Sequence, residues 1–596
     1  MQHPVQALAT LAAQTLNTMY GLSLAGPDVT LQETRKEFAG DFTLVVFPFT
    51  RHSKLAPEAT GQQIGEAIVA ASGGLVRGFN VVKGFLNLEL ADAAWLQAFA
   101  EASAEERFGT GPAKGQRVMV EYSSPNTNKP LHLGHMRNIF LGSALSNLLE
   151  LAGYDVIRAN LVNDRGIHIC KSMVAYQRLG QGETPASSGL KGDHLVGKYY
   201  VEYDKAYKTE LASLKAQGKT DEEAEAASTW AAAARRSLEL WEAGDAETVA
   251  LWKQMNGWVY AGFEATYARM GTRFDKFYYE SDTYLLGKDI VEEGLAKGVF
   301  YQKDDKSVWI DLTAEGLDHK LVLRGNGTSV YITQDLGTAD LKAREYGIDR
   351  SVYVVGNEQD YHFAVLFAIM KRLGRSYADG LFHLSYGMVD LPSGRMKSRE
   401  GTVVDADDLM EETVQEARSR TAELGKVAEM PAAEAEALYE MLGLGALKYF
   451  LLKVEPKKRM TFNPAESIDL QGNTATAIQY SHARICSVLR KAAAEGLEAD
   501  AAPQGYTLHP DERALIAHLA TLPEVVEKAA AEMAPSPLAA FSYDLSRAFN
   551  KFFTSCSILS ADTVAQKRFR LALCTLTARS LRKAMGALGI GLPERM

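Results

Sequence analysis

The stretch RVMVEYSSPNTNKPLHLGHMRNIFLGSALSNLLELAG, residues 117–153, decides the fold of this chain. Val118 to Tyr122 is apolar and β-branched, which predicts a short buried strand, and the polar residues up to Pro130 predict a loop. From Gly134 onward the apolar residues recur at the spacing of a helix with one buried face. The segment therefore predicts a strand, a polar loop and a helix. In a doubly wound sheet, such a helix start binds phosphates through its free N–H groups and its positive dipole end.

Three residues stand at this predicted helix entry: His132, Gly134 and His135. The histidines add hydrogen-bond donors, and Gly134 leaves room for a nucleotide because it has no Cβ. Two other interpretations are open. An HxxH pair can be half of a metal site, but no Glu or third His follows at a useful spacing. Two histidines at a helix start can also be ordinary caps, so the rest of the chain has to decide.

Composition predicts a soluble, multidomain protein. The 596 residues are 46% hydrophobic and 23% charged, which is ordinary for globular domains. The first residues lack a signal-peptide pattern, and no run of 18 apolar residues occurs, so we expect no membrane span. The four cysteines are dispersed, which predicts reduced thiols and a cytoplasmic location. The net charge of −10 argues against indiscriminate nucleic-acid binding, although the end of the chain from Arg547 is basic.

Alternating strand and helix patterns divide the chain. Residues 1–112 predict a small N-terminal α/β domain, whose expected elements include a strand at Asp41–Thr50, and a Gly-rich linker follows. Residues 113–405 alternate between strands and helices, which predicts an α/β, Rossmann-like doubly wound parallel sheet with a helical insertion at about 193–270. Residues 406–470 predict a helical connecting segment, and 471–596 a C-terminal all-α bundle. Within the core we expect SVYITQDLGTADLKAREYG, 329–347, to form a strand and then a helix.

The polar stretch DLPSGRMKSREGT, residues 390–402, follows another predicted strand. Its two glycines and its cations Arg395, Lys397 and Arg399 suit a mobile loop that folds over phosphate charge. A solvated turn is the alternative for such a loop taken alone.

Taken in order, several motifs resemble the arginyl-tRNA synthetase family of class I aminoacyl-tRNA synthetases along essentially the whole chain. HLGH resembles the "HIGH" signature of class I, and RMKSREGT stands where class I carries "KMSKS". The other matching segments are EYSSPNTNKPLHLGH, YITQDLGTAD, NEQDYHF, QYSHARICSVLRKA and the closing GLPERM. The N-terminal module is similar to the family's extra domain, thought to contact the outer corner of tRNA.

The resemblance implies an arginine–tRNA ligase. The carboxylate of L-arginine attacks the α-phosphate of ATP, and the arginyl group then passes to the 3′-terminal adenosine of tRNA(Arg), with release of AMP and pyrophosphate. Mg²⁺ is expected with ATP, and protein-bound zinc is not expected. We expect the protein to be a monomer. We also expect catalysis to depend mainly on positioning the substrates and stabilising the charge that develops in the transition state. Arginine enzymes typically require tRNA before activation, which carries over as an expectation.

The resemblance also implies site residues. The expected catalytic residues are His132, His135, Lys129, Arg395, Lys397 and Arg399. ATP is expected to contact His132, Gly134, His135, Met396 and Ser398. The residues expected to bind arginine are Glu121, Ser123, Asn126, His132, Tyr331, Asp335 and Gln359.

A guanidinium is planar and always charged, so its pocket should offer carboxylates and an aromatic wall. Glu121 and Asp335 would be these carboxylates, with Tyr331 as the aromatic partner. Each has a plainer alternative: Glu121 as a surface carboxylate, Tyr331 as a core aromatic and Asp335 as an N-cap. Such a pocket should reject lysine strongly enough that no editing domain is needed.

The match departs from the family pattern at two positions. Ser398 stands at the second lysine of "KMSKS", and Lys129 is thought to supply the missing cation. Gln334 stands where the family usually has Arg, which leaves the role of position 334 open.

Three alternatives remain at the level of the sequence. One is an HxGH nucleotidyltransferase that acts on a small molecule, although such enzymes lack a tRNA-sized C-terminal bundle. Another is a catalytically silent tRNA-binding paralog, against which the intact HLGH argues. The third is a class I synthetase for another amino acid. The absence of a Cys/His zinc cluster in the sequence weighs against the cysteine enzyme, but it does not exclude the glutamine or glutamate enzymes.

Overall fold

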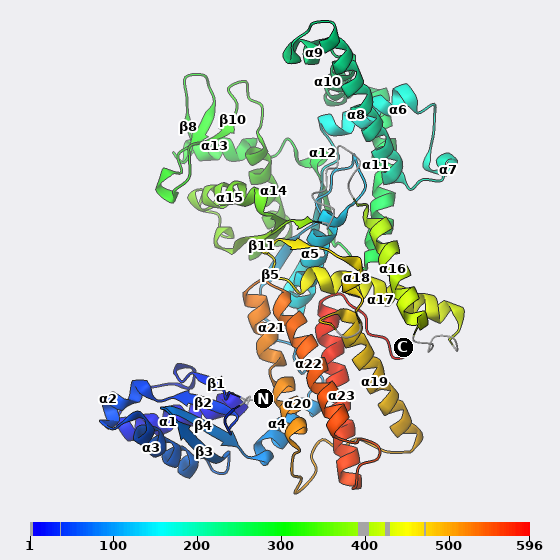
Figure 1. Ribbon diagram of the computed structural model, residues 1–596. Helices are drawn as coiled ribbons and strands as arrows, with labels where there is room; N and C mark the ends of the chain where they lie inside the picture. Colours follow the sequence, from blue (N-terminus) through cyan, green and yellow to red (C-terminus); the bar gives the residue numbers. More distant parts are fainter. Residues whose placement is uncertain (1–3, 36, 391–403, 424–429, 470–471) are drawn as a thin grey trace.

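The computed structural model describes residues 4–35, 37–390, 404–423, 430–469 and 472–596. Figure 1 shows a central parallel sheet with two arms on one side of it and a long helical bundle on the other. The N-terminal module lies beside the bundle, where α4 contacts α20. The parallel sheet and the helical C-terminal domain confirm the predicted fold class.

The central sheet has five parallel strands in the order β12-β11-β5-β6-β7. Their bounds are β5 Arg117–Glu121, β6 Asp155–Val162, β7 Lys276–Tyr279, β11 Arg350–Gly356 and β12 Leu381–Tyr386. The three middle strands are almost wholly buried, as is usual for the central strands of a parallel sheet. Helix α5 (Leu133–Leu151) crosses from β5 to β6, so the loop before it opens at the carboxyl edge of the sheet.

The first arm contains the helices predicted at about 193–270, together with α6 and α7, which precede them. Its helices are α6 Ile167–Leu179, α7 Pro185–Ser188, α8 Gly192–Ala216, α9 Asp221–Ala227, α10 Thr229–Glu242 and α11 Ala246–Met270. Helix α11 runs back to β7, and α8 packs along it.

The second arm is a three-stranded antiparallel sheet, β10-β9-β8, with helices beside it. Its elements are α12 Glu280–Thr283, α13 Lys288–Ala296, β8 Tyr301–Gln302, β9 Val308–Ile310, β10 Lys320–Leu323, α14 Tyr331–Tyr346 and α15 Asp360–Arg372. The strand predicted at the start of residues 329–347 was wrong. Helix α14 begins at Tyr331 because the Thr333 hydroxyl accepts a hydrogen bond from the Val330 N–H at 3.0 Å, which caps the helix.

The N-terminal module is an antiparallel sheet in the order β1-β2-β4-β3, with helices packed against it. Its elements are α1 Pro4–Tyr20, β1 Leu31–Glu33, β2 Phe42–Val45, α2 Thr50–Ser53, α3 Pro57–Ala71, β3 Val76–Val82, β4 Phe85–Leu90 and α4 Asp92–Ala104. The strand predicted at Asp41–Thr50 is shorter than expected. A 3₁₀ turn at Phe47–Phe49 ends it because Pro48 has no N–H to donate to the sheet.

The C-terminal region is helical, apart from a short pairing of β13 (Val389–Asp390) with β14 (Met460–Thr461). Its helices are α16 Ala406–Glu423, α17 Ala432–Leu452, α18 Pro464–Ser467, α19 Ala475–Ala494, α20 Pro510–Ala520, α21 Leu522–Ala531, α22 Ser536–Ser555 and α23 Val564–Ala587. Among the described residues, no helix combines the length and the apolar character that crossing a membrane requires.

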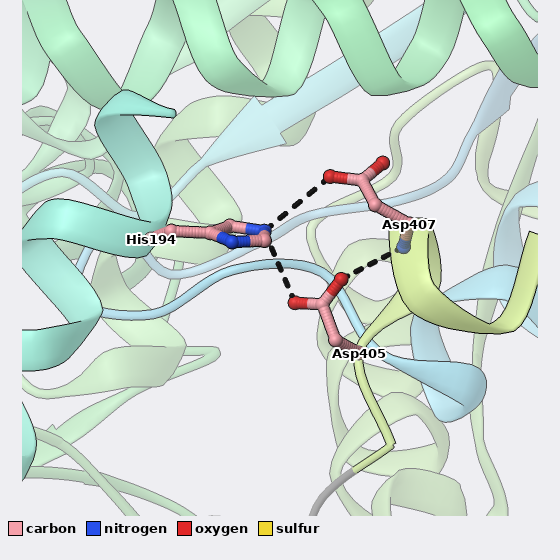
Figure 2. Close-up of side chains that lie close together, drawn as sticks. All are labelled: His194, Asp405 and Asp407. Carbon is pink, nitrogen blue, oxygen red and sulfur yellow. Dashed lines mark hydrogen bonds and ion pairs between the residues drawn. The ribbon is translucent and has the colours of Figure 1, made fainter. Parts of the chain in front are cut away.

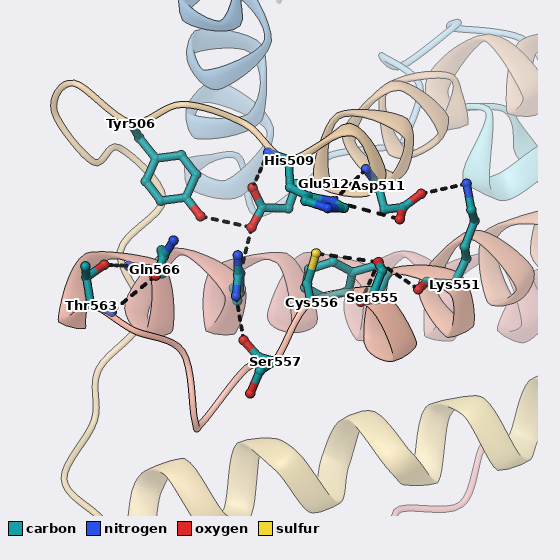
Figure 3. Close-up of polar contacts among 12 residues, drawn as sticks. Tyr506, His509, Asp511, Glu512, Lys551, Ser555, Cys556, Ser557, Thr563 and Gln566 are labelled. Carbon is teal, nitrogen blue, oxygen red and sulfur yellow. Dashed lines mark hydrogen bonds and ion pairs between the residues drawn. The ribbon is translucent and has the colours of Figure 1, made fainter.

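One buried carboxylate ties the bundle together, as Figure 3 shows. Glu512 on α20 is fully buried and accepts hydrogen bonds from the Tyr506 hydroxyl at 2.9 Å and the His509 N–H at 2.9 Å. Arg570 on α23 donates to it at 2.7 Å and also donates to the Ser557 carbonyl at 2.6 Å. The carboxylate therefore joins two helices and the loop before α20.

Candidate active site

The histidines of the HLGH segment form the N-terminal cap of α5. His132 is the N-cap residue, and its Nδ1 accepts a hydrogen bond from the Gly134 N–H at 3.1 Å. The His132 N–H donates to Nδ1 of His135 at 3.2 Å, and the two rings lie 3.9 Å apart between centroids. A Cβ on Gly134 would lie 3.0 Å from Cε1 of His132, so glycine leaves the imidazole its place.

Both rings are neutral. Burial, reinforced by the charge of Lys129, lowers the pKa of His132 to about 3. Burial, with the neighbouring His132 and Lys129, also holds the pKa of His135 well below its usual range. Because each Nδ1 accepts a backbone N–H, the proton of each neutral ring resides on Nε2. The helix entry therefore presents two Nε2–H donors in addition to its own backbone N–H groups.

The loop between β5 and α5 has a constrained backbone. Ser123 and Ser124 both have positive φ angles, +73° and +44°, which residues other than glycine rarely adopt. Asn138 on α5 accepts the Ser123 N–H at 2.6 Å, and Asn160 on β6 accepts the Ser124 N–H at 3.1 Å. The Ser123 hydroxyl bonds the Tyr267 hydroxyl at 2.6 Å, so Ser123 is turned into the core.

The segment that starts α16 pairs with the HLGH segment. The Leu133 N–H donates to the Val404 carbonyl at 3.2 Å, and the Ala406 N–H donates to the Leu131 carbonyl at 3.0 Å. His132 and Asp405 thus form an antiparallel bridge. The residues predicted in the "KMSKS" loop, Arg395, Met396, Lys397, Ser398 and Arg399, lie outside the described residues.

Two predicted carboxylates lie at the carboxyl edge of the sheet, and each already has a cationic or imidazole partner. Glu121 ends β5, is only 7% exposed and forms an ion pair with Lys342 of α14. Asp335, two turns before Lys342 on the same helix, lies 2.6 Å from Nε2 of His362. Despite burial, the charges of Glu121 and Asp335 together raise the pKa of Lys342, which places both carboxylates near one ammonium.

Sequence reasoning missed a third carboxylate, Glu280, which follows the last residue of β7. Burial, together with the charges of Asp164 and Asp335, raises its pKa to about 7. Asp164 is itself buried, but the Ser281 N–H donates to it at 2.8 Å and the Tyr260 hydroxyl at 2.8 Å. The signal was available in FDKFYYESD, because carboxylates that directly follow a parallel strand lie at the ligand-binding edge.

The remaining predicted substrate residues stand at the rim of this edge. Tyr331 opens α14 and is 80% exposed, so it is not a core aromatic. Asn126 lies in the loop after β5 and forms a parallel bridge with Asn163 after β6. Gln359 ends the 3₁₀ turn Asn357–Gln359 after β11. All three are exposed.

A pocket of about 240 Å³ opens beside His132. Lys129 and His132 from the segment between β5 and α5 line it together with His194 and Tyr200 from α8 and Asp405 from the start of α16. Figure 2 shows His194 pointing at Asp405 and Asp407, and its Nε2 lies 3.2 Å and 3.3 Å from their carboxylate oxygens. The insertion therefore closes one wall of the site.

Comparison with known proteins places this geometry in a family. The model of the class I tRNA synthetase catalytic domain of the arginine (R) type matches residues 101–463, and the DALR anticodon binding domain matches residues 478–596. The arginine–tRNA ligase of Bacteroides thetaiotaomicron is 55% identical over 584 residues, which cover 98% of each chain. The chain belongs to the arginyl-tRNA synthetase family.

Further similarities agree with this membership. The arginine–tRNA ligase of Amoebophilus asiaticus is 53% identical over 97% of both chains. The solved Thermus thermophilus arginyl-tRNA synthetase superposes with a TM-score of 0.79 at 25% identity over 100% of both chains. The Plasmodium falciparum arginyl-tRNA synthetase, at 19% identity and a TM-score of 0.77, shares the fold. The family that the HLGH, YITQDLGTAD and NEQDYHF segments predicted is therefore confirmed.

Proposed function

We propose that this chain is an arginine–tRNA ligase that activates L-arginine with ATP and transfers it to the 3′-terminal adenosine of tRNA(Arg). The observation that carries the proposal is the pairing of two features at one sheet edge. The HLGH helix entry supplies donors for phosphate, and the carboxylates Glu121, Glu280 and Asp335 gather beside it. A nucleotide and a guanidinium are the two ligands that these features suit.

In the first step, the arginine carboxylate attacks the α-phosphate of ATP in line and pyrophosphate leaves. His132 and His135 donate from Nε2 to the developing phosphate charge, and their neutrality lets them act without a change of protonation. Gly134 keeps the helix start open for the nucleotide, and Lys129, on the wall of the same pocket, adds positive charge. Mg²⁺ would arrive with the ATP phosphates.

In the amino-acid pocket, Asp335 and Glu280 receive the guanidinium, with Tyr331 as the aromatic wall. Glu280 has its pKa raised to about 7 in the empty site, so a bound cation favours its ionised form. Asn126 and Gln359 at the rim orient the α-amino and carboxylate groups. Ser123, turned into the core, acts on the substrate through the shape of the loop rather than by direct contact. Lysine would leave these paired acceptors unsatisfied, which supplies discrimination without editing.

The C-terminal bundle, at the opposite end of the molecule from the two arms (Figure 1), offers a second contact for the tRNA. A pocket of about 570 Å³ in the C-terminal bundle is lined by cations and aromatic rings: Tyr480, Arg484, Arg490, Lys491, Phe553 and Arg595. The Arg484 guanidinium lies 4.9 Å from the Tyr480 ring centroid and 5.0 Å from that of Phe553. Stacking surfaces next to positive charge suit single-stranded RNA bases, so this pocket is proposed to take the anticodon loop. We also propose a cytoplasmic monomer.

The test of the function is charging of purified tRNA with each of the twenty amino acids. Arginine alone should be attached, and ATP–pyrophosphate exchange should depend on arginine. Asp335→Ala should raise the KM for arginine at least tenfold. It should leave the KM for ATP within about twofold, because Asp335 is proposed to contact the guanidinium and not the phosphates. An unchanged KM for arginine would remove Asp335 from the pocket, and charging with a different amino acid would overturn the assignment.

A further inference from the structure

A polar cluster joins the helical insertion to the catalytic domain, and we name it the insertion clasp. It consists of Lys191, Asp193 and His194 at the start of α8 and Asp405 and Asp407 at the start of α16. Figure 2 shows its centre, where His194 reaches from α8 between the two aspartates. The two halves are more than 200 residues apart in the sequence, so only the tertiary fold brings them together.

Every carboxylate of the clasp has a cationic partner from α8. The Lys191 ammonium pairs with Asp407 and lies 3.3 Å from Asp193. It also donates to the Thr266 hydroxyl of α11 at 2.6 Å, and that hydroxyl donates to Asp407 at 3.1 Å. His194 lies 3.2 Å from Asp405. Three elements, α8, α11 and α16, therefore meet at Asp407.

The donor set resembles that of a metal site, because His194, Asp405 and Asp407 place their ligand atoms within 4.8 Å of one another. The charges argue otherwise. The ion pairs of its Nε2 with Asp405 and Asp407 raise the pKa of His194 to about 10, which favours an imidazolium, and an imidazolium has no lone pair for a metal. Against the effect of burial, His194 and Lys191 hold the pKa of Asp407 well below its usual range. Lys191 and His194 therefore balance the negative charges of Asp405 and Asp407, as a bound metal ion otherwise would.

The clasp acts on the backbone of the HLGH segment. Asp405 forms the antiparallel bridge with His132, and the neighbouring Ala406 N–H and Val404 carbonyl bond Leu131 and Leu133. Asp405 also accepts the Asp407 N–H at 2.8 Å, which caps α16 and fixes one aspartate relative to the other. A shift of the α16 start would therefore move the segment that carries His132.

We propose that Lys191 and His194 are positioning residues for the catalytic histidines, and that the insertion holds the HLGH segment in register through the clasp. The inference rests on the proposed role of His132 at the α-phosphate. A donor must lie within hydrogen-bonding distance of the place where charge develops, so a small displacement of His132 lowers the rate of the chemical step. The carboxylates that receive the guanidinium, Glu280 after β7 and Asp335 on α14, lie outside the clasp, so the affinity for arginine should change little.

The first variant is Lys191→Met, which keeps most of the length of the side chain and removes its charge. We expect kcat for pyrophosphate exchange, with arginine and tRNA present, to fall at least tenfold while the KM for arginine stays within twofold. The matched control is Lys208→Met on the same helix, where Lys208 pairs with Asp204 at 2.7 Å in an exposed i,i+4 arrangement. This control should leave kcat and the melting temperature unchanged.

A second pair of variants separates positioning from stability. Lys191→Met leaves Asp407 without its ammonium and should lower the melting temperature. The double variant Lys191→Met with Asp407→Leu removes the stranded charge and should recover most of that loss. Positioning predicts that kcat stays low in the double variant, because the link is still broken. Recovery of kcat together with the melting temperature would show a purely structural role and overturn the proposal.

His194→Gln provides an independent measurement, because it keeps a hydrogen-bond donor near the aspartates but removes the positive charge. It should fold even if Lys191→Met does not, and it should lower kcat at least threefold without changing the KM for arginine. A kcat equal to that of the wild type would overturn the proposal. If the wild-type protein itself fails to show arginine-dependent exchange, the proposed function fails instead, so the two failures are distinguishable.

Discussion

The pKa of Glu280 gives the sharpest prediction for the amino-acid pocket. Burial, with Asp164 and Asp335 nearby, raises this pKa to about 7 in the empty site. A guanidinium binds the carboxylate form, and that form is lost as the pH falls through 7. At about pH 6 roughly one tenth of the empty sites are ionised, so the KM for arginine should be roughly tenfold higher than at about pH 8.

Glu280→Gln keeps the shape and one acceptor but removes the charge. A hydrogen bond to a charged group contributes about 1.5–3 kcal/mol, which corresponds to a rise in the KM for arginine of roughly 10- to 150-fold. The variant should also lose the pH dependence of KM between about pH 6 and pH 8, because Gln does not titrate. The KM for ATP should change by less than about twofold.

The assay is arginine-dependent pyrophosphate exchange at a series of pH values, with tRNA present. Glu292→Gln on α13 is the matched control, since Glu292 is an exposed carboxylate on the same arm. Its KM and pH profile should equal those of the wild type. A Glu280→Gln enzyme that keeps the wild-type pH profile for arginine would show that another group titrates, and would remove Glu280 from the pocket.

Three further predictions follow from buried or stacked charges. Lys342→Met strands Glu121, which is 7% exposed, and should cost about 3–5 kcal/mol of stability; adding Glu121→Gln should restore most of the melting temperature, and no recovery would contradict the pairing. Glu512→Gln removes the carboxylate that pairs with the Arg570 guanidinium and should lower the free energy of unfolding by about 3 kcal/mol in urea titrations. An unchanged unfolding transition would show that Glu512 does not stabilise the bundle. Arg484→Ala should weaken tRNA binding at least fivefold in a filter-binding assay without changing exchange with saturating tRNA, and equal affinity would place the tRNA elsewhere.

Local patterns predicted most elements, because their periodicity reflects which face is buried. Strand β5 and helix α5 appear where the sequence of residues 117–153 predicts a strand and a helix. The strand expected near Ser329 failed because a capping hydroxyl, Thr333, started a helix where a short alternating pattern favoured a strand. Such a competition between two local signals is decided by the neighbouring structure.

Without the family resemblance, the site could be predicted only where its residues are contiguous. HLGH and its loop could be interpreted as a phosphate-binding helix start because strand, loop and helix follow one another within 40 residues. The partners Lys342 of Glu121 and His362 of Asp335 could not be predicted, since they come from distant elements. The sequence could have placed Glu280 at the sheet edge, because it directly follows a strand, but not its raised pKa, which depends on Asp164 and Asp335 approaching it in the fold.

By itself, the sequence determined the class of fold, the strand–loop–helix entry that we propose to bind the nucleotide, and the family. These depend on local periodicity and on contiguous motifs, which burial and hydrogen bonding impose over a few residues. The tertiary structure alone decided which charges meet: Lys342 with Glu121, and the insertion clasp of Lys191 and His194 with Asp405 and Asp407. Electrostatic interactions depend on distance in space, and residues more than 200 positions apart come within a few ångströms of each other only when the chain has folded.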